Sequence, residues 1–191
     1  MRHVISALVM NEPGVLASVA GMFAARGFNI DSLVVGRTEN PDLSRMTVVC
    51  DADDNTIEQI RKQLAKLVPI VKVRDFQSTA YIERDLALVN IGVGPEKRGE
   101  VIEIVNLFRG KIVDVSPNAI VVELTGPESK LEALIELLQP YGIKELARTG
   151  VIAMARGLQA AKDAAEDKHA STGGKRVRTI NAPPAVALPP S

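Results

Sequence analysis

The chain has 191 residues, enough for one or two domains, and 46% of them are hydrophobic, so a packed core is expected. Its 23 basic and 23 acidic residues cancel, and it has no Trp, two Tyr and four Phe. This composition gives no reason to expect nucleic acid or an anionic membrane as a partner, and it leaves few rings for base stacking. The single cysteine, Cys50, excludes an intramolecular disulfide. Its apolar neighbours predict a small buried residue in a reducing compartment.

No apolar run reaches the roughly 18 residues that a membrane-spanning helix needs. The short apolar run at residues 4–10 is predicted to be a strand and not the core of a signal peptide. Asn11, Glu12 and Pro13 follow it, and no small-residue cleavage site appears. We therefore expect a cytoplasmic protein.

The first 77 residues alternate between strand and helix patterns. In the first expected helix, Val15, Val19, Met22 and Phe23 recur on one face. The second is expected to begin at Asn55 in a capping box with Glu58; the acidic turn before it explains its aspartates better than a cation site does. The elements expected in order are strand 3–10, helix from 15, strands 28–36 and 43–50, helix from 55, and strand 70–76.

The same order returns after a more polar linker at residues 78–85. The glycine-rich segment 92–99 lacks the spacing of a phosphate-binding loop and is explained as a turn. The stretch 150–155 either extends the last strand or pairs elsewhere. The elements expected are strand 86–93, helix 100–107, strands 111–116 and 119–125, a helix after Pro127, and strand 143–148.

The predicted fold class is therefore α+β, with two tandem ferredoxin-like (βαββαβ) modules. We expect a first module at 1–77, a linker at 78–85, a second module at 86–157, and an Ala/Pro-rich, disordered tail at 158–191. A module of about 75 residues with one helical layer leaves a sheet face and two edges open. These surfaces predict burial against another module or another chain, and we favour a homodimer.

The turn after the first strand is the candidate binding element. Asn11 and Pro13 predict a turn, and Gly14 leaves space where the helix presents unpaired N–H groups. Such a helix start attracts an anion, for instance the carboxylate of a free amino acid. From the spacing alone, a plain strand–turn–helix corner is the favoured explanation, because short motifs often occur by chance.

The sequence gives no catalytic constellation. Its only histidines are His3, at the start of a strand, and His169, in the tail. No Ser-His-Asp or Cys-His arrangement is expected within a module, and no Cys/His set has metal-ligand spacing. We predict no catalytic residue, cofactor or metal in this chain.

Several motifs in one register carry a family resemblance. The chain resembles the small, regulatory subunit of acetolactate (acetohydroxyacid) synthase over roughly residues 1–157. The segments that carry it are 1–6 (MRHVIS), 11–16 (NEPGVL), 26–33 (RGFNIDSL), 43–47 (LSRMT), 63–68 (QLAKLV), 83–89 (ERDLALV), 108–115 (FRGKIVDV) and 147–151 (ARTGV).

The resemblance implies that residues 1–77 form an ACT domain, an amino-acid-binding regulatory module, and that 86–157 form the C-terminal domain of this family. It implies a subunit without activity of its own, bound to a catalytic (large) subunit that carries thiamine diphosphate, magnesium and FAD. That subunit condenses pyruvate with pyruvate or 2-oxobutyrate. The small subunit would raise its activity and confer feedback inhibition by valine, or by leucine or isoleucine, in branched-chain amino-acid biosynthesis.

The resemblance also implies an effector site where two ACT domains of a homodimer meet. Asn11, Gly14, Val15 and Leu16 of one chain would form the turn side, and Asn29 and Ile30 of the other chain the second-strand side. The N–H groups of Gly14 to Leu16 would bind the effector carboxylate. The two asparagine oxygens would accept from its ammonium, and Ile30 and Leu33 would hold its branched side chain.

Two other classes compete with this expectation. A free-standing ACT-type amino-acid sensor for a different enzyme would share the first module but not the match of the second. An RNA-binding ferredoxin-like protein should display aromatic residues on its central strands, where this chain has Ser6, Leu8, Met46 and Val48.

Overall fold

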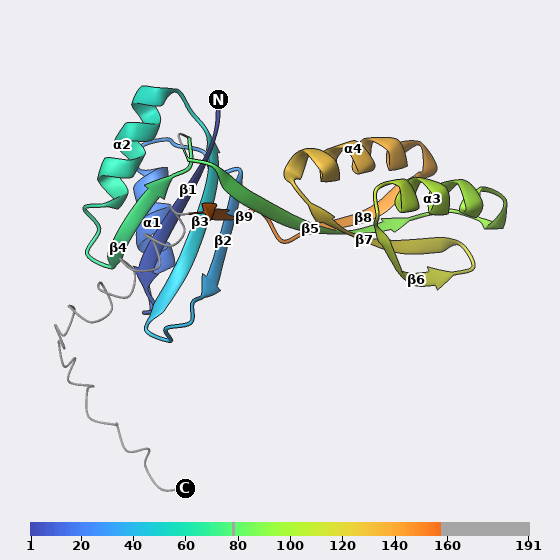
Figure 1. The fold of residues 1–191 in the computed structure, drawn as a ribbon, viewed down its shortest axis with the longest axis horizontal. Coiled ribbons are helices and arrows are strands. Elements are labelled where there is room, and N and C mark those ends of the chain that lie inside the picture. The colour runs from blue at the N-terminus through green and yellow to red at the C-terminus, as the bar shows by residue number, and fades with distance from the viewer. Residues whose placement is uncertain (78, 158–191) are drawn as a thin grey trace, which may run out of the picture.

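The computed structural model describes residues 1–77 and 79–157, which form two βαββαβ modules joined by a long strand (Figure 1). The predicted α+β class with tandem ferredoxin-like modules is confirmed. In chain order the elements are β1 (Arg2–Met10), α1 (Val15–Ala24), β2 (Ser32–Arg37), β3 (Leu43–Asp51), α2 (Asp54–Leu64), β4 (Ile70–Asp75), β5 (Tyr81–Ile91), α3 (Pro95–Leu107), β6 (Lys111–Ser116), β7 (Ala119–Gly126), α4 (Glu128–Leu138), the 3₁₀ turn η1 (Gln139–Tyr141), β8 (Ile143–Arg148) and β9 (Ile152–Ala155).

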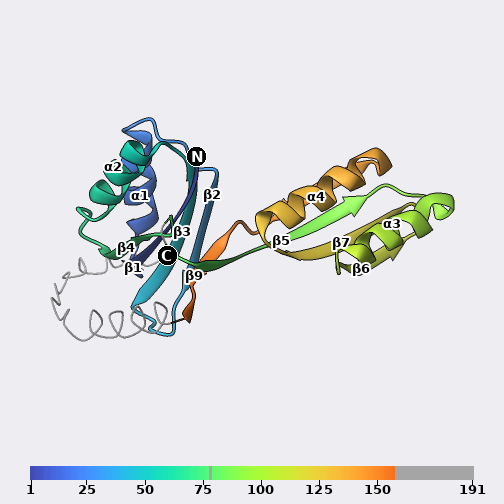
Figure 2. The ribbon, with the colours of Figure 1, turned by 45° about the horizontal axis from the view of Figure 1, so that its top comes forward.

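The first sheet is antiparallel, in the order β2-β3-β1-β4. Successive side chains of a strand point to opposite faces, so Ile5 and Ala7 face α1 and α2 together with Met46 and Val48. The predicted inward residues of α1, namely Val15, Val19, Met22 and Phe23, are all buried. Both helices lie on this one face of the sheet (Figure 2). The other face carries Ser6, Thr47 and Val34.

The second sheet repeats the plan, in the order β6-β7-β5-β8. Its core lies between the sheet and the α3/α4 pair, where Leu131, Leu134 and Leu138 of α4 are fully buried. α3 begins at Pro95 and not at the predicted position 100, because Pro95 occupies the first helical turn, where no N–H is needed. The predicted 92–99 turn therefore ends at Gly94.

β5 serves both modules. It begins at Tyr81 and not at the predicted Leu86, so it takes up part of the predicted 78–85 linker. Residues 81–84 pair with β9, and residues 85–91 pair with β7 and β8. Of the two alternatives for 150–155, the structure therefore shows pairing elsewhere: Ile152–Ala155 forms a strand against β5.

The two-stranded ribbon of Tyr81–Arg84 and β9 covers part of the open face of the first sheet. Val4 and Val49 of that sheet form a small core with Phe76, Val151 and Ala153. The N–H of Val151 donates to Ser32 Oγ on β2 at 3.1 Å. The open face of the sheet was predicted to be buried against another module or another chain. For this part of the face, the ribbon of the same chain provides the burial.

Gly150 is required where the ribbon approaches β2. Its φ is +88°, in the left-handed region, and a Cβ at this position would lie 2.6 Å from Ser32 Oγ. The same residue donates its N–H to Asp85 Oδ1 at 3.1 Å. Gly150 therefore links the ribbon, the first sheet and the start of the second sheet.

A buried carboxylate lies at the junction. The side chain of Asp85 has no exposed surface and accepts from Arg148 Nε at 2.8 Å, from Arg148 Nη2 at 2.5 Å and from the Thr149 hydroxyl at 3.2 Å. Burial lowers the pKa of Arg148, but its bonds to Asp85 and Glu132 outweigh that effect and raise the pKa overall. The guanidinium therefore stays charged.

Two other predicted boundaries differ. The predicted capping box of Asn55 and Glu58 is wrong, because Asp53 caps α2 two residues earlier and accepts from the Thr56 N–H at 2.8 Å. Glu58 instead pairs with Lys62 on the helix surface at 2.8 Å. The second strand, predicted from residue 28, begins at Ser32. The predicted tail at 158–191, with His169, lies outside the described residues.

Candidate effector site

The turn between β1 and α1 leaves a helix start without a side-chain cap. Gly14, at φ +85°, precedes Val15, and no described side chain caps the helix or places an acid in its first turn. The first N–H groups of a helix have no acceptor within it. They and the helix dipole therefore form a site of positive potential, open to an anion.

The residues around this turn differ in their exposure to solvent. Val15 is buried and fixes the helix against the core, whereas Leu16 is 49% exposed. Gly14 is exposed, and a Cβ built there meets no atom within 4 Å. The predicted space at Gly14 is present.

Asn11 is held by the β2–β3 connection. Its Nδ2 donates to the Pro41 carbonyl at 2.9 Å, and its Oδ1 accepts from the Ser44 hydroxyl at 3.1 Å. A carbonyl oxygen has two lone pairs, so Oδ1 can accept a second hydrogen bond. Sequence reasoning missed both contacts, in which Pro41 of the β2–β3 loop and Ser44 of β3 hold the Asn11 amide.

Asn29 and Ile30 precede β2 and do not lie within it. The Asn29 Nδ2 donates to Asp31 Oδ1 at 2.7 Å, which orients the amide, and Ile30 packs half-buried against the first core. Asp31 is a further residue that sequence reasoning missed. Its position, two residues after an asparagine, was the available signal.

One chain does not bring the two predicted halves together. Asn11 follows Met10, beside the Arg37 end of β2, where Arg37 pairs with Ser44. Asn29 precedes the other end, where Ser32 pairs with Val49. Ser32 and Arg37 are five residues apart, which is about 17 Å along a strand.

A twofold axis would join them. β2 is an edge strand of the first sheet, paired on one side with β3. If β2 pairs antiparallel with β2 of a second copy, the partner's Ser32 end lies beside this chain's Arg37 end. The Asn29 segment of one copy would then approach the Asn11–Leu16 turn of the other.

Among the described residues, no group of three or more His, Cys, Asp or Glu side chains could hold a metal ion. No helix in that part of the chain is long and apolar enough to span a membrane. Cys50 is 1% exposed, and burial, reinforced by Asp31, raises the pKa of its thiol to about 11.

The fold and this turn define an ACT-type module followed by a second ferredoxin-like module, and comparison with known proteins agrees. Residues 5–72 match the "AHAS small subunit-like ACT domain", and residues 84–157 match the "Small subunit of acetolactate synthase". The chain belongs to the acetolactate synthase small-subunit family, which makes it a regulatory subunit distinct from the catalytic one. Membership implies association with a catalytic subunit.

Three relatives illustrate the similarity. The chain is 54% identical over 157 residues to a "Probable acetolactate synthase small subunit" of Archaeoglobus fulgidus, covering 82% of this chain and 98% of the relative. It is 48% identical over 155 residues to the acetolactate synthase small subunit of Mycolicibacterium smegmatis, covering 81% and 92%. The crystal structure of the small subunit from Thermotoga maritima superposes with a TM-score of 0.75 at 46% identity, covering 82% and 98%.

Proposed function

We propose that this subunit binds a branched-chain amino acid at the interface of two ACT domains and thereby inhibits the catalytic subunit that it otherwise stimulates. The observation that carries the proposal is the uncapped start of α1 at Gly14, beside an asparagine amide held in place by Pro41 and Ser44. The cofactors expected for the reaction, thiamine diphosphate, magnesium and FAD, belong in this proposal to the catalytic subunit.

The chemistry of a zwitterion matches the groups available. The carboxylate would accept from the N–H groups at Gly14, Val15 and Leu16, with support from the helix dipole. The ammonium would donate to Asn11 Oδ1 and to the Oδ1 of Asn29 from the other copy. Neutral amide oxygens suit this role, because an isolated buried carboxylate would cost several kcal/mol to desolvate.

The branched side chain would contact Ile30 and Leu33. Both are partly buried against the first core, so they present a fixed apolar surface. The proposed homodimer forms through β2, whose Val35 is 44% exposed on the free edge. Two ACT domains, at residues 1–77 of each copy, would thus make two equivalent sites.

Regulation would follow from a population shift. An effector biases a conformational equilibrium only through its different affinity for the two states. A site shared by two chains changes its affinity whenever the chains move relative to each other, so it can report that movement to the catalytic subunit. The second module is accounted for by the family match of residues 84–157, which a free-standing amino-acid sensor would not need.

The test is Gly14→Asp in the enzyme reconstituted with its catalytic subunit. The new carboxylate occupies the position of the effector carboxylate, so valine, leucine and isoleucine should lose inhibition while stimulation of acetolactate formation persists. Gly142→Asp is the matched control, because Gly142 also has a left-handed φ, +87°, and within 4 Å its Cβ would meet only the Gly92 carbonyl oxygen, at 3.9 Å, but it lies in the second module. Unchanged valine inhibition in Gly14→Asp would show that the site lies elsewhere.

A further inference from the structure

The side chains along the free edge of β2 follow an order that suits pairing of this strand with itself. Asp31 directly precedes β2, and Arg37 ends it. Side chains alternate between the two faces of a strand, and Leu33 packs against the core on the helix side. The helix side of this edge therefore carries, in order, Asp31, Leu33, Val35 and Arg37. An acid lies at one end, a base at the other, and two apolar residues lie between them.

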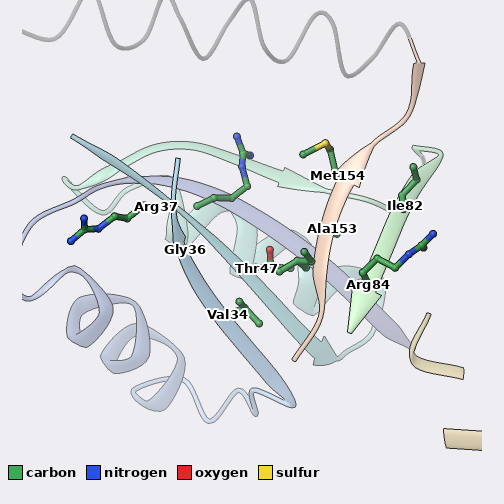
Figure 3. Close-up of a pocket in the computed structure, with 10 residues that line it drawn as sticks. Val34, Gly36, Arg37, Thr47, Ile82, Arg84, Ala153 and Met154 are labelled. Atoms are coloured by element: carbon green, nitrogen blue, oxygen red, sulfur yellow. The ribbon is translucent and has the colours of Figure 1, made fainter. Parts of the chain in front are cut away.

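Both charges are available to a second chain. Asp31 and Arg37 are exposed. Asp31 Oδ1 accepts from Asn29 Nδ2 at 2.7 Å, which leaves the second carboxylate oxygen for another donor. In the close-up of the open face of the sheet, Arg37 points away from Val34 and Thr47, as expected for a side chain on the opposite face (Figure 3).

The backbone of β2 limits the registers in which it can pair. The Thr38 N–H donates to the Leu43 carbonyl of β3 at 3.2 Å, so the even-numbered residues of β2 direct their N–H and C=O groups toward β3. These groups alternate in direction along an antiparallel strand. Those of Leu33, Val35 and Arg37 therefore point to the free edge, and an odd-numbered residue can bond only an odd-numbered residue of a second copy.

We infer that β2 pairs with β2 of a second copy in the register that sets Val34 opposite Val34, so that Asp31 of each copy forms an ion pair with Arg37 of the other. In this register Leu33 lies opposite Val35 of the second copy on the same face. A shift by two residues also satisfies the backbone, but it separates the acid from the base, and opposite charges stabilise a cross-strand pair. The register rests on the proposed function, because it specifies the β2 contact that the shared effector site requires.

The ion pair connects the dimer contact to the effector site. Asp31 holds Asn29 of its own chain with one oxygen and Arg37 of the second copy with the other. Arg37 pairs along the sheet with Ser44, whose hydroxyl donates to Asn11 Oδ1. The same contact thus places Asn29 of one copy beside the Asn11 turn of the other. Asp31 and Arg37 act as positioning residues for the effector site.

Disulfide cross-linking of the full chain, without effector, reads the register. Residues opposed in a pair without direct hydrogen bonds lie about 4.5 Å apart at Cα, within the range of a disulfide, so a mild oxidant should convert Val34→Cys into a covalent dimer. Val35→Cys is the matched control. Its two copies are diagonal neighbours about 7–8 Å apart, and it should cross-link at least about tenfold more slowly.

The wild-type chain should give no covalent dimer, because Cys50 is 1% exposed. Cross-linking of Val35→Cys or Leu33→Cys as fast as that of Val34→Cys would overturn the register. So would the absence of a covalent dimer from folded Val34→Cys.

Charge exchange tests the ion pair by a second route. Arg37→Glu brings like charges together at two symmetric contacts, and it should raise the dimer Kd about tenfold in sedimentation at low salt. Asp31→Lys/Arg37→Glu restores opposite charges and should return the Kd to within about threefold of the wild type. Arg61→Glu makes the same change at an exposed residue of α2 and should leave the Kd unchanged. Equal weakening in the single and double variants would overturn the ion pair.

The two proposals fail in different ways. A dimer that cross-links through Val34, in an enzyme that no branched-chain amino acid inhibits, would refute the proposed function and support the register. A dimer that cross-links through Val35, in an enzyme that valine inhibits, would refute the register and leave the proposed function in place.

Discussion

Replacing Asp85 by Ala should destabilise the junction between the modules more than any substitution of a surface charge there. The carboxylate is fully buried and accepts four hydrogen bonds, two from Arg148 and one each from Thr149 and Gly150. Asp85→Ala leaves the partly buried N–H of Gly150 without its acceptor and takes one carboxylate partner from the guanidinium.

The magnitude follows from these bonds. Two hydrogen bonds from neutral donors contribute about 1 kcal/mol each, and bonds from a charged donor contribute about 1.5–3 kcal/mol. The lower value applies to Arg148, because its side chain is 26% exposed and keeps Glu128 and Glu132 as partners. With two bonds of each kind the sum is about 5 kcal/mol, which lowers Tm by about 10–20 °C for a chain of this size.

The assay is thermal and urea unfolding of the purified subunit, followed by circular dichroism. Glu132→Ala is the matched control, because Glu132 bonds the same guanidinium at 2.5 Å but is 57% exposed. Exposed pairs contribute about 0–1 kcal/mol, so this variant should unfold within about 2–4 °C of the wild type. Similar losses in both variants would refute the reasoning that the buried acceptor holds the junction.

Three further outcomes are expected. Gly150→Ala should lose at least about 1–2 kcal/mol of stability, because Ala is strained at φ +88° and its Cβ contacts Ser32; Gly36→Ala, with open space and no left-handed φ, should change urea unfolding little. The pKa of Asp53 is lowered by its hydrogen bonds to the helix start. Its contribution to stability is therefore present above pH ~4 and is lost as the pH falls through the lowered pKa. Asp53→Asn, which can still cap the helix, should reduce the loss of stability on acidification, measured by urea unfolding at a series of pH values. Cys50, with its pKa raised to about 11, should resist a thiolate-directed reagent at pH ~8 until urea unfolds the chain; fast labelling of the native protein would contradict its burial.

Hydropathy periodicity predicted most elements because each helix buries one stripe and each strand alternates. The predicted inward positions of α1 are all buried, and the repeated βαββαβ order is present. Boundaries failed where a single side chain decided them. Asp53, and not the predicted Asn55, caps α2. α3 begins at Pro95, within the segment 92–99 whose glycines had predicted a turn.

The junction could not be predicted because its partners are distant in sequence. Asp85 and Gly150 are 65 residues apart, and Val151 reaches Ser32 across 119 residues. The polar character of residues 78–85 indicated a linker, and the pairing of residues 81–84 with residues 152–155 makes part of it a strand. At the candidate effector site the local sequence pattern predicted the turn residues, whereas the contacts of Pro41 and Ser44 with Asn11 could be seen only in the folded hairpin.

The continuity of β5 has a mechanical consequence. A flexible tether would let the two halves of the subunit rotate freely, but here one backbone passes from a ribbon on one sheet into the centre of the next. A slip of one residue in this strand would turn its inward and outward side chains over in both halves at once. Rotation of one module is therefore expected to twist β5 and so to act on the other module through the backbone, without a chain of coupled side chains between them.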